Sequence, residues 1–194
     1  MIKKNLLIIL CLVGVVSVAQ KKTDGTPKPV WKRDTVIAGN VFKIYSNWIN
    51  IGLGLLRNPT IPRTHITAGV DLNFHITNQY FQVGAMLAGE GYGIYSTSEL
   101  HLCYGKRTEN RKYNCDFFGG LSYSTFNAFS NGNYATEPSK EIGVYGMAQA
   151  IRKITYDVGI GISAFAEINS KQSMFGLRLD LYFSGAYKGK KKDE

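Results

Sequence analysis

The stretch MFGLRLDLYFSGAY, residues 174–187, alternates between two kinds of side chain. One set is large and apolar: Phe175, Leu177, Leu179, Leu181 and Phe183. The other is small or polar: Gly176, Arg178, Asp180, Tyr182 and Ser184. Because successive side chains of a β-strand point to opposite faces of the sheet, this stretch predicts a strand with one apolar and one polar face.

The same period of two runs through most of the chain, for example in HITAGVDLNFHI at 65–76. It predicts an all-β fold of eight strands, which we place at residues 43–56, 65–76, 80–90, 94–105, 113–126, 141–151, 154–168 and 174–187. Strands of soluble proteins are usually about 5 to 6 residues long, whereas a tilted strand needs about 9 to 11 residues to cross a bilayer. Most of the expected strands are long enough to cross.

The ends of the chain indicate export. Lys3 and Lys4 precede the apolar run 6–16, and Ser17-Val18-Ala19 supplies small residues before Gln20. This pattern predicts a signal peptide at 1–19, cleaved before Gln20. Its loss lowers the formal charge from +9 to +7. We expect a flexible leader at 20–40, a barrel at 41–187 and a polar tail at 188–194.

The bilayer limits which folds can cross it. It offers no water to unpaired backbone groups, so only helices and closed barrels span it. The chain resembles the small outer-membrane β-barrel proteins of Gram-negative bacteria. That resemblance implies an eight-stranded, antiparallel, up-and-down transmembrane barrel, with the assembly machinery as a partner that reads Tyr187. One connection departs from the expected alternation of short inner turns and longer outer loops: residues 106–112 make a long inner turn.

The polar face of each strand would point into the barrel. Eight strands leave an interior that side chains just fill, so we expect an ionic plug rather than a channel. By parity, its members are Asp71, His75, Glu90, Glu99, His101, Asp116, Asp157, Glu167, Arg178 and Asp180. Aromatic girdles at the two membrane interfaces would include Trp48, Tyr80, Phe81, Tyr104, Tyr113, Phe126, Tyr156, Phe175 and Tyr187.

One group of residues suggests catalysis. His75-Ile76-Thr77-Asn78, followed by Glu90, is similar to the His-x-Ser-Asn element and glutamate of the outer-membrane lipid A deacylases. This resemblance implies Thr77 as nucleophile, His75 as base and Glu90 as the group that orients the histidine. Threonine replaces the serine, and the element falls early in the chain. The other interpretation is a polar lumen row that ends in a turn.

The remaining features concern cysteines, surface charge and cofactors. Cys103 and Cys115 flank residues 106–112 and are candidates for a disulfide, although they fall on opposite faces by parity. Phosphates of outer-membrane lipids and lipopolysaccharide are the expected partners of basic residues in the outer loops. No phosphate loop, clustered metal-ligand spacing or nucleic-acid module is present, so we expect no cofactor. The basic loop residues are Arg57, Arg63, Lys140 and Lys171.

Three functions follow from these observations. The first is a non-enzymatic outer-membrane barrel that serves envelope integrity or surface interaction. The second is an outer-membrane lipid hydrolase. The third is a soluble periplasmic barrel that binds a small apolar ligand and has its apolar faces inside.

Overall fold

The computed structural model describes residues 34–59, 63–76, 79–89, 95–130, 133–134 and 138–190. Within this part of the chain, no helix is long and apolar enough to cross a membrane. The strands are β1 (Asp34–Ile37), β2 (Asn40–Lys43), β3 (Trp48–Asn58), β4 (Arg63–Ile76), β5 (Gln79–Gly89), β6 (Tyr95–Glu109), β7 (Tyr113–Ser130), β8 (Asn133–Tyr134), β9 (Ser139–Lys153), β10 (Val158–Asn169), β11 (Ser173–Ser184) and β12 (Tyr187–Lys190).

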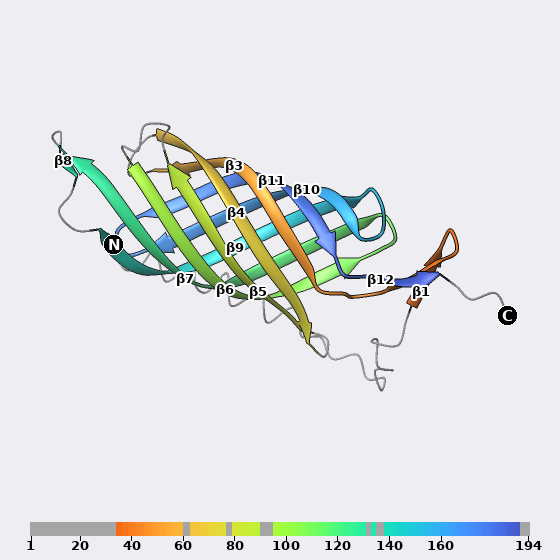
Figure 1. The fold of residues 1–194 in the computed structure, drawn as a ribbon. Helices are drawn as coiled ribbons and strands as arrows, with labels where there is room; N and C mark the ends of the chain where they lie inside the picture. The colour runs from red at the N-terminus through yellow and green to blue at the C-terminus, as the bar shows by residue number, and fades with distance from the viewer. Residues whose placement is uncertain are drawn as a thin grey trace. The chain divides into compact units, whose positions relative to one another are not determined.

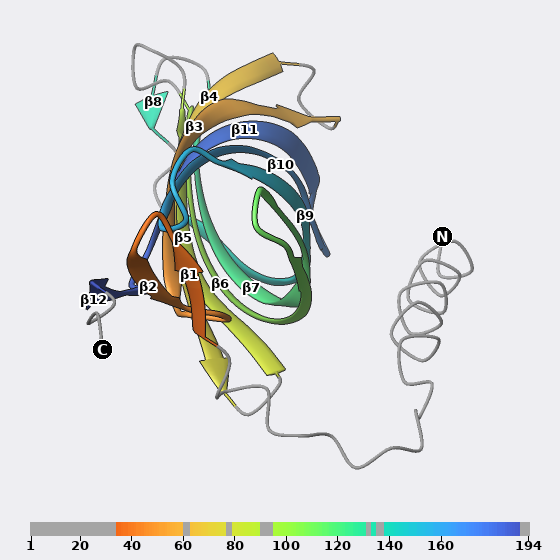
Figure 2. The same cartoon turned by 90° about the vertical axis from the view of Figure 1, so that its right-hand side faces the viewer.

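Eight of these strands form a closed barrel (Figures 1 and 2). β3, β4, β5, β6, β7, β9, β10 and β11 each pair antiparallel with the next barrel strand in the sequence. β11 then pairs with β3 and closes the barrel. This topology confirms the predicted eight-stranded, up-and-down, antiparallel barrel. The two-residue β8 only extends the end of β7.

The connections at one end of the barrel are short. There β4 leads to β5 through 77–78, β6 to β7 through 110–112, and β9 to β10 through 154–157. We call this the turn end and the opposite end the loop end. In outer-membrane barrels short turns face the periplasm. The prediction of a long inner turn at 106–112 was wrong, because β6 continues to Glu109.

A hydrogen-bonded turn ends that β6–β7 hairpin. The backbone amide of Asn110 donates to the carbonyl oxygen of Tyr113 at 2.9 Å. The Asn110 side-chain oxygen accepts from the backbone amides of Lys112 and Tyr113, at 2.9 and 2.7 Å. An asparagine that bonds its own following backbone in this way favours a tight turn over a continued strand.

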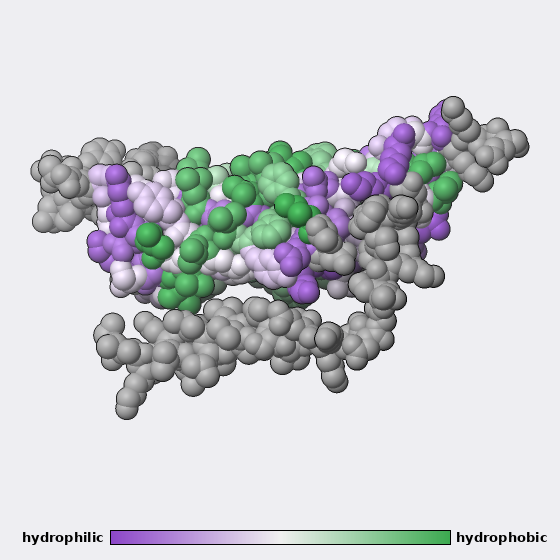
Figure 3. Space-filling model, turned by 90° about the horizontal axis from the view of Figure 1, so that it is seen from below, coloured by the Kyte–Doolittle hydropathy of each residue, from purple (hydrophilic) through white to green (hydrophobic). Residues whose placement is uncertain are grey.

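The barrel is apolar outside and polar inside. On β11, Leu179 is 68% exposed and Leu177 60%, whereas Arg178 between them is 1% exposed. Figure 3 shows apolar side chains gathered over the middle of one face, with polar ones toward the ends. This polarity is the reverse of what a soluble barrel with an apolar interior requires. The structure therefore contradicts the hypothesis of a soluble periplasmic barrel that binds an apolar ligand.

The aromatic side chains divide between the two faces. Four members of the predicted girdles are buried rather than on the outer wall: Trp48, Tyr80, Phe126 and Tyr156. Others lie on the outer surface, where Phe81 and Tyr104 pack edge to face with ring centroids 5.7 Å apart. Only part of the predicted set can therefore contribute to a girdle, because parity turns the rest inward.

A second, three-stranded sheet has the order β1-β2-β12. The backbone amide of Lys43 donates to the Ala186 carbonyl at 2.7 Å, and Phe42 packs on Tyr156 with centroids 5.2 Å apart. Residues 34–37 thus form a strand within the predicted leader 20–40, and β2 begins at its last residue, Asn40. Likewise, 187–190 form a strand rather than a polar tail. The barrel itself begins at β3, after the predicted boundary at residue 41.

We predict that Leu179→Arg destabilises the protein in vesicles by about 2–4 kcal/mol, the usual cost of a cation on the lipid face near the bilayer midplane. Denaturant unfolding of protein refolded into phospholipid vesicles measures this free energy. Leu179→Ala controls for the lost side chain. Equal unfolding midpoints for the two variants would show that Leu179 meets water, since exposed substitutions usually change stability by about 0.5 kcal/mol or less.

Candidate functional site

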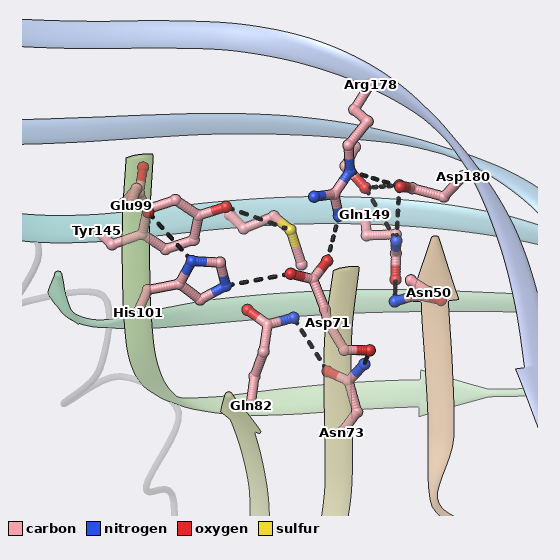
Figure 4. A network of polar contacts seen from close by, with 12 residues as sticks. Asn50, Asp71, Asn73, Gln82, Glu99, His101, Tyr145, Gln149, Arg178 and Asp180 are labelled. Carbon is pink, nitrogen blue, oxygen red and sulfur yellow. Dashed lines mark hydrogen bonds and ion pairs between the residues drawn. The ribbon is translucent and has the colours of Figure 1, made fainter. Parts of the chain in front are cut away.

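The centre of the lumen holds an ionic cluster that joins strands that are not neighbours in the barrel (Figure 4). Arg178 on β11 donates from Nε to Asp180 Oδ1 at 2.5 Å and from Nη2 to Asp71 on β4. All three side chains are fully buried. An arginine with planar, fixed donors suits two carboxylates at once, so the guanidinium links β11 to β4 over the intervening strand β3.

A histidine extends this cluster to β6. His101 lies with Nε2 3.2 Å from Asp71 Oδ1 and Nδ1 3.1 Å from Glu99 Oε1. The ring stacks on Tyr145, with centroids 4.1 Å apart and an interplanar angle of 5°. A ring held by both nitrogens and one face has a fixed orientation. It therefore serves as a positioned bridge between two carboxylates.

Amides and a hydroxyl complete the hydrogen bonds around Asp180. Gln149 on β9 donates to Asp180 Oδ2 at 2.9 Å, and Ser163 on β10 donates to the same oxygen. Asn50 on β3 donates in turn to Gln149 Oε1 at 3.0 Å. Buried charges are costly unless they are paired and hydrogen-bonded, and this second layer provides the remaining bonds.

Glycines leave the space that the cluster occupies. A Cβ atom on Gly69 would clash with the Arg178 guanidinium, and one on Gly84 would clash with His101 and Asp71. Both glycines lie on lumen-facing positions of β4 and β5. Their role is therefore close approach rather than backbone freedom.

A second ionic cluster lies at the turn end. Arg107 donates from Nη2 to the Tyr182 hydroxyl at 2.9 Å, and its guanidinium lies 3.9 Å from the Trp48 ring centroid. Glu109 pairs with Arg107 at 3.5 Å and also accepts from Lys153. Cation–π contact and ion pairing together hold the guanidinium in a buried position.

The turn between β9 and β10 packs against this second cluster. The Lys153 ammonium lies 3.8 Å from the centroid of the Tyr156 ring, in the turn between β9 and β10. Burial and the nearby Glu109 carboxylate raise the pKa of the Tyr156 phenol above its ordinary value. The phenol is therefore neutral at physiological pH and packs against the cation through its ring.

Most of the predicted lumen residues do point inward. Of the other three, Glu90 lies outside the described residues. Asp157 belongs to the turn 154–157, because β10 begins only at Val158. His75 is half-buried at the turn end, where its ring packs on those of Tyr45 and Tyr80. The buried members are Asp71, Glu99, His101, Asp116, Glu167, Arg178 and Asp180.

The structure does not bring the candidate catalytic residues together. His75 pairs with Tyr80 at the turn end of β5, whereas Gly89, the residue before Glu90, lies at its loop end. At about 3.4 Å per residue these positions are about 30 Å apart. Thr77 and Glu90 themselves lie outside the described residues. The residues that the structure describes therefore give no support to the expected relay.

The predicted disulfide is absent as well. Cys103 and Cys115 both have free thiols. Cys103 is buried in the lumen opposite Gly120, whereas Cys115 is exposed on the outer wall opposite Thr108. Side chains on opposite faces of neighbouring strands cannot reach each other, and no bulge brings them together.

The turn-end cluster was not among the predicted sites. Arg107 and Glu109 continue the odd-numbered inward row of Glu99 and His101, but we had ended that strand at residue 105. The alternation itself was the usable signal. Adjacent charges at 106–107 and 109 made the end of the strand resemble a polar turn.

Among the described residues, no group of three or more His, Cys, Asp and Glu is placed to hold a metal ion.

Solved structures of bacterial outer-membrane barrels share this fold. Neisserial surface protein A matches with a TM-score of 0.57 and 8% identity, covering 71% of this chain and 95% of its own. The N-terminal β-barrel domain of Pseudomonas aeruginosa OprF matches with a TM-score of 0.53 and 11% identity, covering 71% and 98%. The sequence matches no known family and no curated protein.

The protein is therefore a small eight-stranded β-barrel of the bacterial outer-membrane type, as the resemblance in its sequence predicted. At these identities the likeness shows the fold alone. Any role has to be argued from this chain's own residues.

We predict that Arg178→Met lowers the free energy of unfolding by about 3–5 kcal/mol, because Asp71 and Asp180 would remain buried without a cation. Denaturant unfolding in vesicles measures the change. Arg57→Met, at an exposed position on β3, is the matched control and should shift stability by about 0.5 kcal/mol or less. Adding Asp71→Asn to Arg178→Met should recover part of the loss. Equal stability of the two arginine variants would contradict the cluster's role.

The two cysteines should differ in reactivity. In folded protein in detergent, a maleimide should label Cys115 on the outer wall, while Cys103 in the lumen should react only after unfolding. Mass spectrometry of Cys115→Ser and Cys103→Ser variants assigns the label. A change in gel mobility on adding reductant to the monomer would instead reveal an intramolecular disulfide.

Proposed function

We propose that the protein is exported by a cleaved signal peptide at 1–19 to the outer membrane. There it acts as a non-enzymatic barrel, with a role in envelope integrity or surface interaction. The observation that carries this proposal is the buried Asp71–Arg178–Asp180 cluster, which hydrogen bonds extend to His101 on β6 and Gln149 on β9. A barrel whose lumen is filled by such a network is a scaffold rather than a passage.

The closed interior supports this proposal over a transport role. Large side chains from different walls meet in the lumen, among them the fully buried Arg178, Tyr145 and Tyr182. Eight-stranded barrels have interiors that side chains can fill, whereas pores need more strands. Opening a channel would require separating ion pairs that are shielded from water.

The loop end supports a surface role through its charge. Arg57 and Lys140 are exposed there and are candidates for contact with lipopolysaccharide phosphates. Lys171 is paired with Glu141 at 2.7 Å, so its charge is already partly satisfied. The Arg63 side chain lies outside the described part.

Purified protein reconstituted in planar bilayers should show no stable conductance, because the lumen is filled. An Arg178→Ala, Asp71→Ala, Asp180→Ala triple variant, if it folds, should conduct more than the wild type. A heat-dependent shift in gel migration establishes that each sample is folded. Stable single-channel steps from the folded wild type would contradict the proposal that side chains close the lumen.

A strain lacking the gene separates the two roles left open. Loss of resistance to large antibiotics or bile-type detergents indicates a role in integrity. Complementation with a barrel whose 131–137 segment is replaced by a short turn should restore that resistance if the barrel itself carries the role. If the wild type restores resistance and this loop-shortened barrel does not, the result indicates a role in surface interaction instead.

A further inference from the structure

Four exposed cations surround the first residues of β7, at the turn end of the barrel. Lys106 lies on the outer face of β6, and Arg152 lies on the outer face of β9. Arg111 and Lys112 lie in the turn that joins β6 to β7. The four residues come from two hairpins that adjoin in the barrel wall.

The register places Lys106 and Arg152 on either side of β7. Lys106 is opposite Phe117, and Arg152 is opposite Tyr113. Neighbouring strands lie about 4.8 Å apart, and Phe117 and Tyr113 are four residues apart along β7, so the backbones of Lys106 and Arg152 are about 17 Å apart. Their side chains can reach one phosphate between them when both are extended, or two adjacent phosphates.

These cations differ from those in the lumen. Arg107, Lys153 and Arg178 all have carboxylate partners inside the barrel. No ion pair with an acidic side chain of the described chain occurs for the four cations around β7. Their charges are therefore available to a partner outside the protein.

The surface beside these cations is aromatic and apolar. Phe117 is 63% exposed and Tyr113 49%. A depression on the outer wall is lined by Tyr113, Arg152, Ala150, Cys115 and apolar residues of the neighbouring strands. Cations at the membrane edge beside an apolar wall match the two parts of a phospholipid: a charged headgroup and acyl chains.

On the described barrel strands, the outward-facing cations at the turn end lie on β6 and β9 only, while the small sheet carries the exposed Lys43, Lys188 and Lys190. At the turn ends of β3, β4, β5, β10 and β11, the outward positions of the described residues carry no lysine or arginine. They are Ile49, Phe74, Ile76, Gln79, Phe81, Val158, Ile160 and Phe183. A general attraction to the membrane surface would not need this asymmetry, whereas a discrete site would produce it.

We propose that the outer face of β6, β7 and β9 at the turn end is a binding site for an anionic phospholipid of the periplasmic leaflet. Lys106, Arg152, Arg111 and Lys112 contact the phosphate, and Tyr113 packs at the level of the headgroup. The acyl chains lie along Cys115 and Ala150. The site depends on the membrane-spanning fold and not on the proposed role in envelope integrity or surface interaction.

Native mass spectrometry of the full mature protein in zwitterionic detergent tests this site. The probes are dimyristoyl phosphatidylglycerol and, with the same chains, dimyristoyl phosphatidylcholine. Near a membrane surface each basic residue contributes roughly fivefold in affinity for anionic lipid, so Lys106→Gln/Arg152→Gln should weaken phosphatidylglycerol binding about 25-fold. Phosphatidylcholine binding should not change.

Arg57→Gln/Lys140→Gln removes the same charge at the loop end and is the matched control. This control should retain wild-type preference for phosphatidylglycerol. Both double variants alter exposed side chains, and a heat-dependent gel shift verifies their folding. Equal weakening in both variants, or no preference for phosphatidylglycerol in the wild type, would overturn the site. Neither result would bear on the conductance test of the closed lumen.

Discussion

The guanidinium of Arg178 lies between two carboxylates at the centre of the barrel, and the arrangement of the interior depends on that contact. Asp71 is 107 residues away in sequence, yet it is brought to Arg178 by the curvature of the wall. The space comes from glycines on neighbouring strands, and the remaining hydrogen bonds come from Gln149 and Ser163. Buried ion pairs are weak evidence for stability in themselves. A broken pair, however, leaves a charge without water, and this makes the closed lumen a sharply defined state.

The bilayer imposes the complementary constraint on the outside. Every strand has to hide its backbone in a closed ring and offer hydrocarbon to lipid. Leu177 and Leu179 are therefore exposed, while the charged residues between and beside them are buried. A soluble barrel would exchange these faces. Alternation alone does not reveal which face lies outside, but strand length and the ionic residues in the most apolar strand both favour lipid on the outside.

The sequence contained enough information for the barrel and for the side of the wall on which most polar residues lie. The prediction of strand ends failed where the last residues of a strand are charged. Arg107, Glu109 and Lys153 resembled turn residues, although they point into the lumen, and Asp157 resembled a strand residue, although it lies in a turn. Parity assigns a face but not a height along the barrel axis. This is why parity alone could not show that His75, at the turn end of β4, lies a whole strand length from Gly89 at the loop end of β5.

Longer-range pairing was also beyond local patterns. β2 and β12 are only four residues each and lie at opposite ends of the sequence, so neither produces a recognisable period. The contact between Asp71 and His101 depends on the register of three successive strands. Side-chain identity predicted that buried charges would need partners. Only the three-dimensional register shows which partners they have.

The small sheet has a consequence for the order in which the chain can be completed. β3 and β11 are the first and last barrel strands, and their pairing is the seam of the ring. β2 precedes β3 and β12 follows β11, and the pairing of β2 with β12 joins the two ends of the chain just beyond that seam. A chain made from its N-terminus contains β12 last. The small sheet can therefore form only after the chain has been synthesised through β12, and its pairing then holds the segments on both sides of the seam together.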